Sequence, residues 1–109
     1  MLSEAAWEAS LRDMGYTRKT TFWSDFTIAD AYGEDAIKDT LKRSLDWLSN
    51  VEYGTELVMV LNHKCWEWYK KDEKRSHLYA DLFEKTYDAL REKHKGNDEA
   101  MSYIWQTLD

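Results

Sequence analysis

The stretch that decides the fold is GTELVMVLNHKCWEWYKK, residues 54–71. At about 100° per residue, its apolar side chains cover roughly 200° of a helix surface, twice the usual stripe. The apolar arc consists of Leu57, Val58, Met59, Leu61, Cys65, Trp66, Trp68 and Tyr69. The rest of the surface holds His63, Lys64, Glu67, Lys70 and Lys71, with Val60 among them. A helix with so wide an apolar face is expected at the centre of a helical bundle.

Amphipathic segments flank this helix on both sides. Residues 34–48 place Ile37, Leu41, Leu45, Trp47 and Leu48 on one face. Residues 76–95 follow the charged turn 72–75 and are expected to form a helix that begins at a Ser76 cap. The side chains on its inward face are Leu78, Tyr79, Leu82, Phe83, Tyr87 and Leu90. A last helix runs from an Asn97 cap to about Leu108. This spacing of apolar residues is the signature of α-helices that pack through one face.

The residues before position 34 extend the same pattern. A first helix is expected over residues 4–14, capped by Ser3 and ended by Gly15, and residues 16–24 are expected to form a loop. A short helix should follow over residues 25–32, with Ser24 as its cap and Gly33 as its stop. The whole chain, residues 1–109, is therefore predicted to be a single all-α domain, a compact bundle of five or six helices.

Composition agrees with one globular domain and sets limits on its setting. The chain has 109 residues, no proline and a single cysteine, Cys65. One cysteine excludes an intrachain disulfide and fits a reducing compartment. The N-terminus has no basic region followed by an apolar core, and the longest apolar run, residues 57–61, is too short to cross a bilayer. A cytoplasmic protein without a membrane anchor is expected.

The charge is negative and unevenly distributed. The net charge is −6. Residues 34–56 contain six acidic side chains, Glu34, Asp35, Asp39, Asp46, Glu52 and Glu56, against three basic ones, Lys38, Lys42 and Arg43. Binding to phosphate backbones requires clustered lysine and arginine, so nucleic acid is an unlikely partner. The acidic region serves either as a solvated surface or as a face that meets a basic protein.

No group of residues forms a recognisable catalytic or metal centre. His63 and Cys65 are two positions apart, so on a helix they point about 160° away from each other and cannot share a ligand. His63 and Glu67 share a face, but two ligands do not make a site. Zinc-binding motifs, phosphate loops and nucleophile elbows are absent. We therefore expect a non-enzymatic protein with no cofactor, no metal and no catalytic residues.

One segment has the spacing of a helix-turn-helix motif. Ala29 is followed four residues later by Gly33, after which a second helix begins. That second helix opens with Glu34, Asp35 and Asp39, and phosphates repel all three. DNA binding through residues 37–45 remains an alternative, and an ordinary helical corner is the simpler interpretation.

The aromatic residues indicate a protein-binding surface. Trp7, Trp47, Trp68 and Trp105 lie on apolar stripes and are expected in the core. Trp66 and Tyr87 lie at the polar edges of unusually wide stripes, where tryptophan and tyrosine contribute most to interfaces. The candidate interface consists of Trp66, Tyr87, Trp47, Glu34, Asp35 and Asp39. The function that follows is a protein-interaction module with a protein partner, or a homodimer.

Two stretches add a resemblance to known sequences. TFWSDFTIADAYG, residues 21–33, and TELVMVLNHKCWE, residues 55–67, are similar to short acidic bacterial proteins of unknown function. Such proteins are often encoded near phage or conjugative-element genes. The resemblance covers roughly residues 20–109 and brings no assigned activity. It implies one further alternative, a small acidic inhibitor or decoy of a nucleic-acid-handling complex.

Overall fold

The computed structural model describes residues 21–108, and this part of the chain is helical throughout except for short turns. In chain order the elements are α2 (Thr21–Tyr32), α3 (Glu34–Ser44), the 3-10 helix η1 (Leu45–Ser49), α4 (Val51–Trp68), α5 (Glu73–Lys93) and α6 (Asp98–Leu108). The prediction of a single all-α domain is confirmed. The helix expected over residues 4–14 lies outside the described residues.

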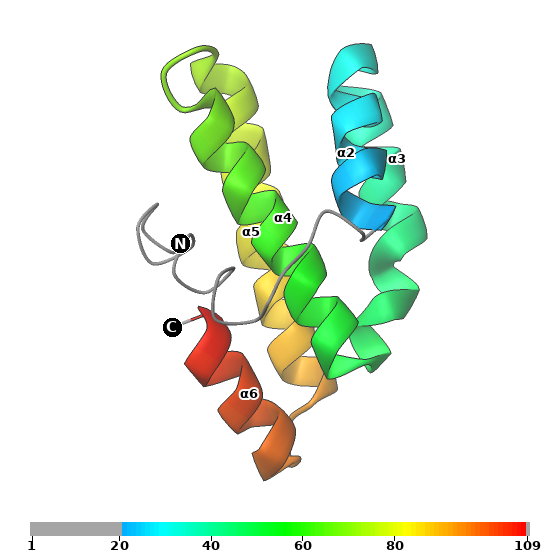
Figure 1. Ribbon diagram of the computed structural model, residues 1–109, viewed down its shortest axis with the longest axis vertical. Coiled ribbons are helices and arrows are strands. Elements are labelled where there is room, and N and C mark those ends of the chain that lie inside the picture. The colour runs from blue at the N-terminus through cyan, green and yellow to red at the C-terminus, as the bar shows by residue number, and fades with distance from the viewer. Residues whose placement is uncertain (1–20, 109) are drawn as a thin grey trace.

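The helices are arranged as two antiparallel hairpins and one further helix (Figure 1). α2 and α3 form the first hairpin, turning at the single residue Gly33. Its φ of 105° lies in the left-handed region, which glycine adopts without steric cost. α4 and α5 form the second hairpin, and α6 packs against α4 near the end where α5 finishes (Figure 1). The two hairpins meet along α2 and α4.

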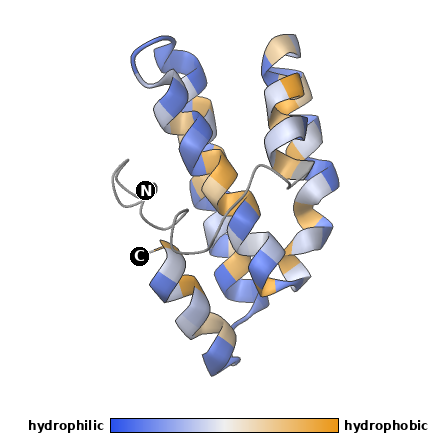
Figure 2. Ribbon diagram, in the orientation of Figure 1, coloured by the Kyte–Doolittle hydropathy of each residue, from blue (hydrophilic) through white to orange (hydrophobic). Residues whose placement is uncertain are grey.

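α4 occupies the centre of the bundle, as its wide apolar face predicts. Leu57, Val58, Met59, Val60 and Leu61 form five consecutive residues without solvent exposure, and α4 contacts α2, α5, α6 and η1. Hydrophobic residues concentrate in the middle of α4 and along α2, whereas the α4–α5 turn is hydrophilic (Figure 2). Burial on all sides requires an apolar surface wider than one stripe, which explains the composition of residues 54–65, whereas Tyr69 of the predicted apolar arc is 57% exposed.

Three helix starts differ from the sequence-based expectation. α2 begins at Thr21, so Ser24 lies within the helix and does not cap it. α4 begins at Val51, three residues before Gly54, because the Asn50 side chain accepts hydrogen bonds from two backbone amides of its first turn. α5 begins at Glu73 after an Asp72 cap, which makes Ser76 an internal, buried residue. The expected cap at Asn97 is confirmed by its bond to the amide of Ala100.

Two tryptophans expected in the core are largely exposed. Trp47 is 45% exposed and Trp105 is 50% exposed, so this prediction was wrong for both. Trp47 lies in η1, in which Leu48 is the buried residue, and at about 100° per residue it falls about 120° from Leu41, at the edge of the stripe that begins in α3. Trp105 lies on α6, where its ring stacks on the Arg91 guanidinium at 5.2 Å. Trp68 is partly buried against the core.

Gly54 allows the end of α5 to approach the start of α4. A Cβ atom at this position would lie 2.5 Å from Leu90 Cδ1 and 3.3 Å from the Cα atom of Leu48. Leu90 is fully buried and cannot move aside freely. The glycine is therefore required by close packing rather than by its backbone angles.

We expect Gly54→Val to lower the free energy of unfolding by about 2 kcal/mol, because the added side chain overfills this contact. Chemical denaturation measures the effect. The matched control is Ala89→Val, which adds a valine to an exposed position within α5 and should cost less than about 0.7 kcal/mol. Equal costs for both substitutions would contradict the close approach at Gly54.

Candidate functional site

The helix α2 presents two different faces, and each forms a candidate site. Its inner face carries Phe22, Phe26 and Asp30 toward the rest of the bundle, and the first two are buried. Its outer face carries Ile28 and Tyr32, which are 60% and 81% exposed. The inner site is a cluster of charged side chains around Asp30, and the outer site is a groove between α2 and α3.

The Asp30 cluster, which comprises Asp30, Lys64, Glu67, Trp68, Arg75 and Tyr79, joins three helices. The carboxylate of Asp30 lies 3.2 Å from Lys64 Nζ and accepts a hydrogen bond of 3.3 Å from Trp68 Nε1. Its other oxygen accepts a hydrogen bond from the Tyr79 hydroxyl. The backbone carbonyl of Asp30 accepts a further bond of 2.7 Å from Arg75 Nη1. One residue of α2 therefore receives contacts from two residues of α4 and two of α5.

The charges of the Asp30 cluster compensate one another. Lys64 Nζ lies 3.0 Å from Glu67 Oε2 and also donates to the hydroxyl of Thr27 at 3.3 Å. The side chains of Lys64 and Asp30 are only 5% and 11% exposed. The guanidinium of Arg75 lies 4.8 Å above the ring of Trp68, a favourable cation–π distance. Burial is the main cause that raises the pKa of the Tyr79 hydroxyl, and the hydrogen bond to Asp30 raises this pKa further.

This cluster was not foreseen from the sequence. The helical wheel places Lys64 and Glu67 on the solvent side of residues 54–71. That expectation was wrong for Lys64, which is buried because Asp30 supplies a counter-charge across the helix contact. The available signal was Asp30 itself, a carboxylate placed one turn after Phe26 on the buried face of α2.

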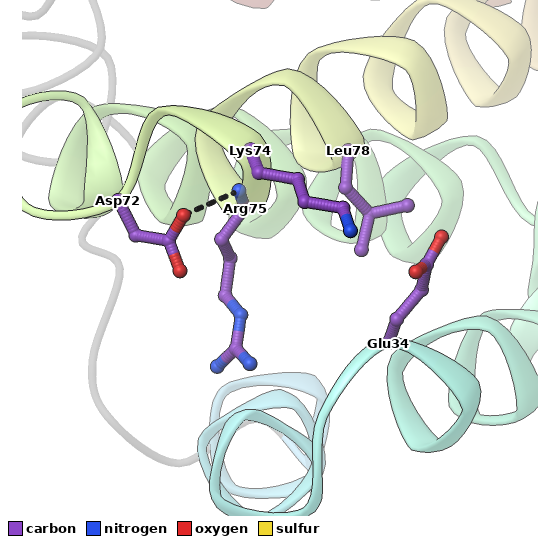
Figure 3. A pocket seen from close by; sticks show the side chains of 5 residues that line it. All are labelled: Glu34, Asp72, Lys74, Arg75 and Leu78. Atoms are coloured by element: carbon purple, nitrogen blue, oxygen red, sulfur yellow. Dashed lines mark hydrogen bonds between the residues drawn. The ribbon is translucent and has the colours of Figure 1, made fainter.

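A shallow pocket of about 170 Å³ lies beside the cluster, lined by Glu34, Asp72, Lys74, Arg75 and Leu78 (Figure 3). Arg75 extends from the first turn of α5 toward the end of α2, and Lys74 and Glu34 project from opposite walls (Figure 3). The donors of Arg75 are directed at Asp30, whereas Lys74, the other cation of the pocket, has no ion pair with any carboxylate between residues 21 and 108. The charges here stabilise the packing of α2 against α5.

His63 and Cys65 lie on different sides of α4, as their spacing predicts. The His63 ring packs on Trp23 of α2 at 4.7 Å, and burial lowers the pKa of His63 to about 4. Cys65 faces α5, where the Ser76 hydroxyl donates to its carbonyl at 3.0 Å. Burial raises the pKa of the Cys65 thiol, which keeps it in the unreactive protonated form. Within residues 21–108 no three potential ligands gather to hold a metal ion.

Glu56 is the one member of the acidic 34–56 region that is buried in the protein. It is 6% exposed, and its Oε1 atom has no hydrogen-bond partner among the described residues. Burial raises the pKa of Glu56 to about 7. A carboxyl group with a raised pKa stabilises the folded state below pH 4.5, and this contribution is lost as the pH rises through 7.

We expect Glu56→Gln to have about the same stability as the wild type near pH 4.5 and to exceed it by about 2–3 kcal/mol at pH 8. The comparison must be made against the wild type at each pH, because His63 acts in the opposite sense. Its lowered pKa destabilises the fold as the pH falls from 6.5 toward 4. Urea denaturation across this range measures the difference, with exposed Glu52→Gln as the control. A difference that does not change with pH would refute the burial of the Glu56 charge.

The hairpin groove is the outer site, and its lining within the described part of the chain comes from α2 and α3. Its volume is about 280 Å³. It is lined by Asp25, Ile28, Ala29, Tyr32, Ala36, Asp39, Thr40 and Arg43. Small side chains, Ala29, Ala36 and Thr40, form the floor, and the exposed Ile28 and Tyr32 rise beside it. A groove with a small-residue floor between two helices admits the side chains of a third helix.

The acidic residues of the predicted interface all lie on α3, and one of them reaches the groove. Asp39 lines the groove and pairs with Arg43 at 3.3 Å. Glu34 pairs with Lys38 at 3.1 Å and lines the pocket beside the Asp30 cluster. Asp35 is exposed in the first turn of α3.

The three aromatic residues of the predicted interface lie apart from these acids. Trp66, on α4, is half-buried and packs on Tyr69 at 5.3 Å. Tyr87, on α5, is half-buried and lies beneath the Arg91 guanidinium at 5.6 Å. Trp47 lies in η1, which directly follows α3 in the chain. It packs edge-on against Phe22 at 6.2 Å and against Tyr53 at 4.9 Å. The sequence pattern did not single out Ile28 and Tyr32, the most exposed apolar residues of the hairpin.

Comparison with known proteins does not assign this fold to a family. No family model matches the chain, and no match is found among curated proteins or among solved structures. Between residues 21 and 108 no helix combines the length and the apolar character that crossing a bilayer requires. The fold defines the class as a small all-α single domain, and the hairpin groove is an open feature on the surface of its described residues.

Proposed function

We propose that this protein is a non-enzymatic interaction module that binds a helix of another protein in the hairpin groove. The observation that carries the proposal is the exposure of Ile28 and Tyr32 on a helix whose opposite face is already used for folding. Exposed large apolar side chains beside a concave, small-residue floor are the usual features of a helix-binding groove.

The charged groups support a binding role over a catalytic one. In the Asp30 cluster each cation faces a carboxylate, and Asp30 accepts bonds from Trp68 and Tyr79 as well. The cluster thus resembles a packing contact, in which no side chain is left to act on a substrate. A DNA-binding role has less support, because α2 and α3 turn at one residue and run antiparallel. A helix-turn-helix uses a turn of about three or four residues and a steep crossing angle.

The test is affinity capture from a lysate of the cells that carry the gene, with three versions of the protein. We expect the wild type to retain a protein that Ile28→Lys loses, because a charge at the groove wall opposes apolar contact. Tyr69→Lys is the matched control, since Tyr69 is 57% exposed on α4, away from the groove. The control should retain the same protein. Identical capture by all three versions, or capture by none, would contradict the proposal.

A further inference from the structure

The hairpin groove is arranged so that it complements itself. Because α2 and α3 are antiparallel and turn at Gly33, each lining residue of α2 lies at about the same height as the lining residue of α3 that is two positions farther from the turn, an offset of about 3 Å along the helix axis. Tyr32 and Ala36 are the lining residues nearest to the turn, and Asp25 and Arg43 are the farthest from it. Each height thus combines a large residue with a small one, or an acid with a base.

We propose that a second copy of this chain occupies the groove, with a two-fold axis parallel to the hairpin helices. The inference rests on the proposed function, because it names a second copy of this chain as the partner that binds in the same groove. Such an axis sets α2 of one copy opposite α3 of the other at the same height, as in a four-helix bundle. Tyr32 of each copy then lies over the partner's Ala36, and Ile28 lies near the partner's Thr40.

The charged ends of the groove specify this orientation. In the parallel arrangement Asp25 of each copy faces the partner's Arg43, so two ion pairs of opposite charge form. Arg43 already pairs with Asp39 through Nε and bonds Thr40 through one terminal nitrogen. Because a guanidinium has five N–H donors, Arg43 can also donate hydrogen bonds to a second carboxylate. If the hairpin of one copy instead ran in the opposite direction to that of the other, Asp25 would lie near the partner's Gly33 turn. That end of the groove contains Tyr32 and no basic residue.

The size of the groove predicts a weak dimer. α2 has 12 residues and is therefore about 18 Å long, and two adjacent helices are about 20 Å wide. A face of this size buries less than the roughly 800 Å² per partner of a standard stable interface. We expect a dissociation constant of about 10–100 μM, with monomer and dimer in rapid exchange.

Charge reversal gives a test that separates this dimer from other outcomes. Sedimentation velocity between about 1 μM and 1 mM should show a concentration-dependent dimer of the wild type. Asp25→Arg and Arg43→Asp each place like charges opposite each other twice, so each alone should weaken association by about 10-fold or more. An equimolar mixture of the two variants brings every arginine opposite an aspartate and should restore association to the wild-type level. Tyr69→Lys, outside the groove, should leave association unchanged.

The possible results distinguish the dimer from the proposed function. A wild type that stays monomeric at about 1 mM, single reversals without effect, or a mixture that fails to recover would each overturn the dimer. None of these results alters the lysate comparison of Ile28→Lys with Tyr69→Lys. Loss of the dimer with retained groove-dependent capture means that the groove binds only a different protein. Loss of both refutes the groove as a binding site.

Discussion

We expect Asp30→Ala to lower the free energy of unfolding by about 3–5 kcal/mol, the largest effect of any charged residue in this protein. Removal of the carboxylate leaves the Lys64 ammonium buried with Glu67 and Thr27 as its partners within residues 21–108. It also removes the acceptor for Trp68 and Tyr79. The loss therefore combines a buried ammonium that keeps only the half-exposed Glu67 as its counter-charge among the described residues with two unsatisfied donors. Equilibrium denaturation in urea measures it.

Two further variants separate the buried cluster from a general charge effect. Asp88→Ala removes an exposed carboxylate from α5 and should change stability by less than about 0.5 kcal/mol. Adding Lys64→Met to Asp30→Ala should recover part of the loss, because an apolar side chain replaces the buried ammonium that has lost Asp30. If Asp30→Ala costs no more than Asp88→Ala, the cluster contributes nothing to the attachment of α2.

We also expect Phe26→Ala to cost about 3–5 kcal/mol, the range for a buried aromatic residue. Phe26 has no solvent exposure, and its ring packs edge-on against Tyr79 of α5 at 6.4 Å. The matched control is Ile28→Ala, two residues away on the same helix. Because Ile28 is 60% exposed, its truncation should cost less than about 0.5 kcal/mol. Thermal or chemical unfolding of the two variants compares the two faces of α2 directly.

Similar costs for Phe26→Ala and Ile28→Ala would contradict the assignment of the faces. A large cost at Ile28 would mean that the outer face of the hairpin belongs to the core. A small cost at Phe26 would mean that α2 is attached to the bundle by the Asp30 cluster alone.

The helical part of the fold could be predicted because it depends on local patterns. The wide apolar surface of residues 54–71 marks α4 as central, since only a helix buried on all sides requires it. The cap at Asn97 followed from a side chain next to its own helix start. The α3 pattern failed at Trp47, because at about 100° per residue this side chain falls about 120° from Leu41, at the edge of the apolar stripe.

The candidate sites could not be predicted because they arise between segments distant in the sequence. Lys64 looked solvated on its own helix, and only the position of Asp30, 34 positions earlier in the chain, makes its burial favourable. Ile28 and Tyr32 looked like ordinary helix residues. Their exposure depends on which face of α2 packs against α3 after the turn at Gly33. Local spacing places Asp30 on the same face as Phe26, but it does not identify Lys64 as the partner of Asp30 or show which face of α2 stays exposed.

The central claim is that α2 folds with one face and binds with the other. The most direct measurement is the unfolding free energy of the double variant Ile28→Lys/Tyr32→Glu, at a concentration below about 1 μM where the proposed dimer is dissociated. The claim requires a value within about 0.5 kcal/mol of the wild type in a variant that no longer associates. A loss of more than about 2 kcal/mol would contradict it, because the outer face would then be part of the folded core.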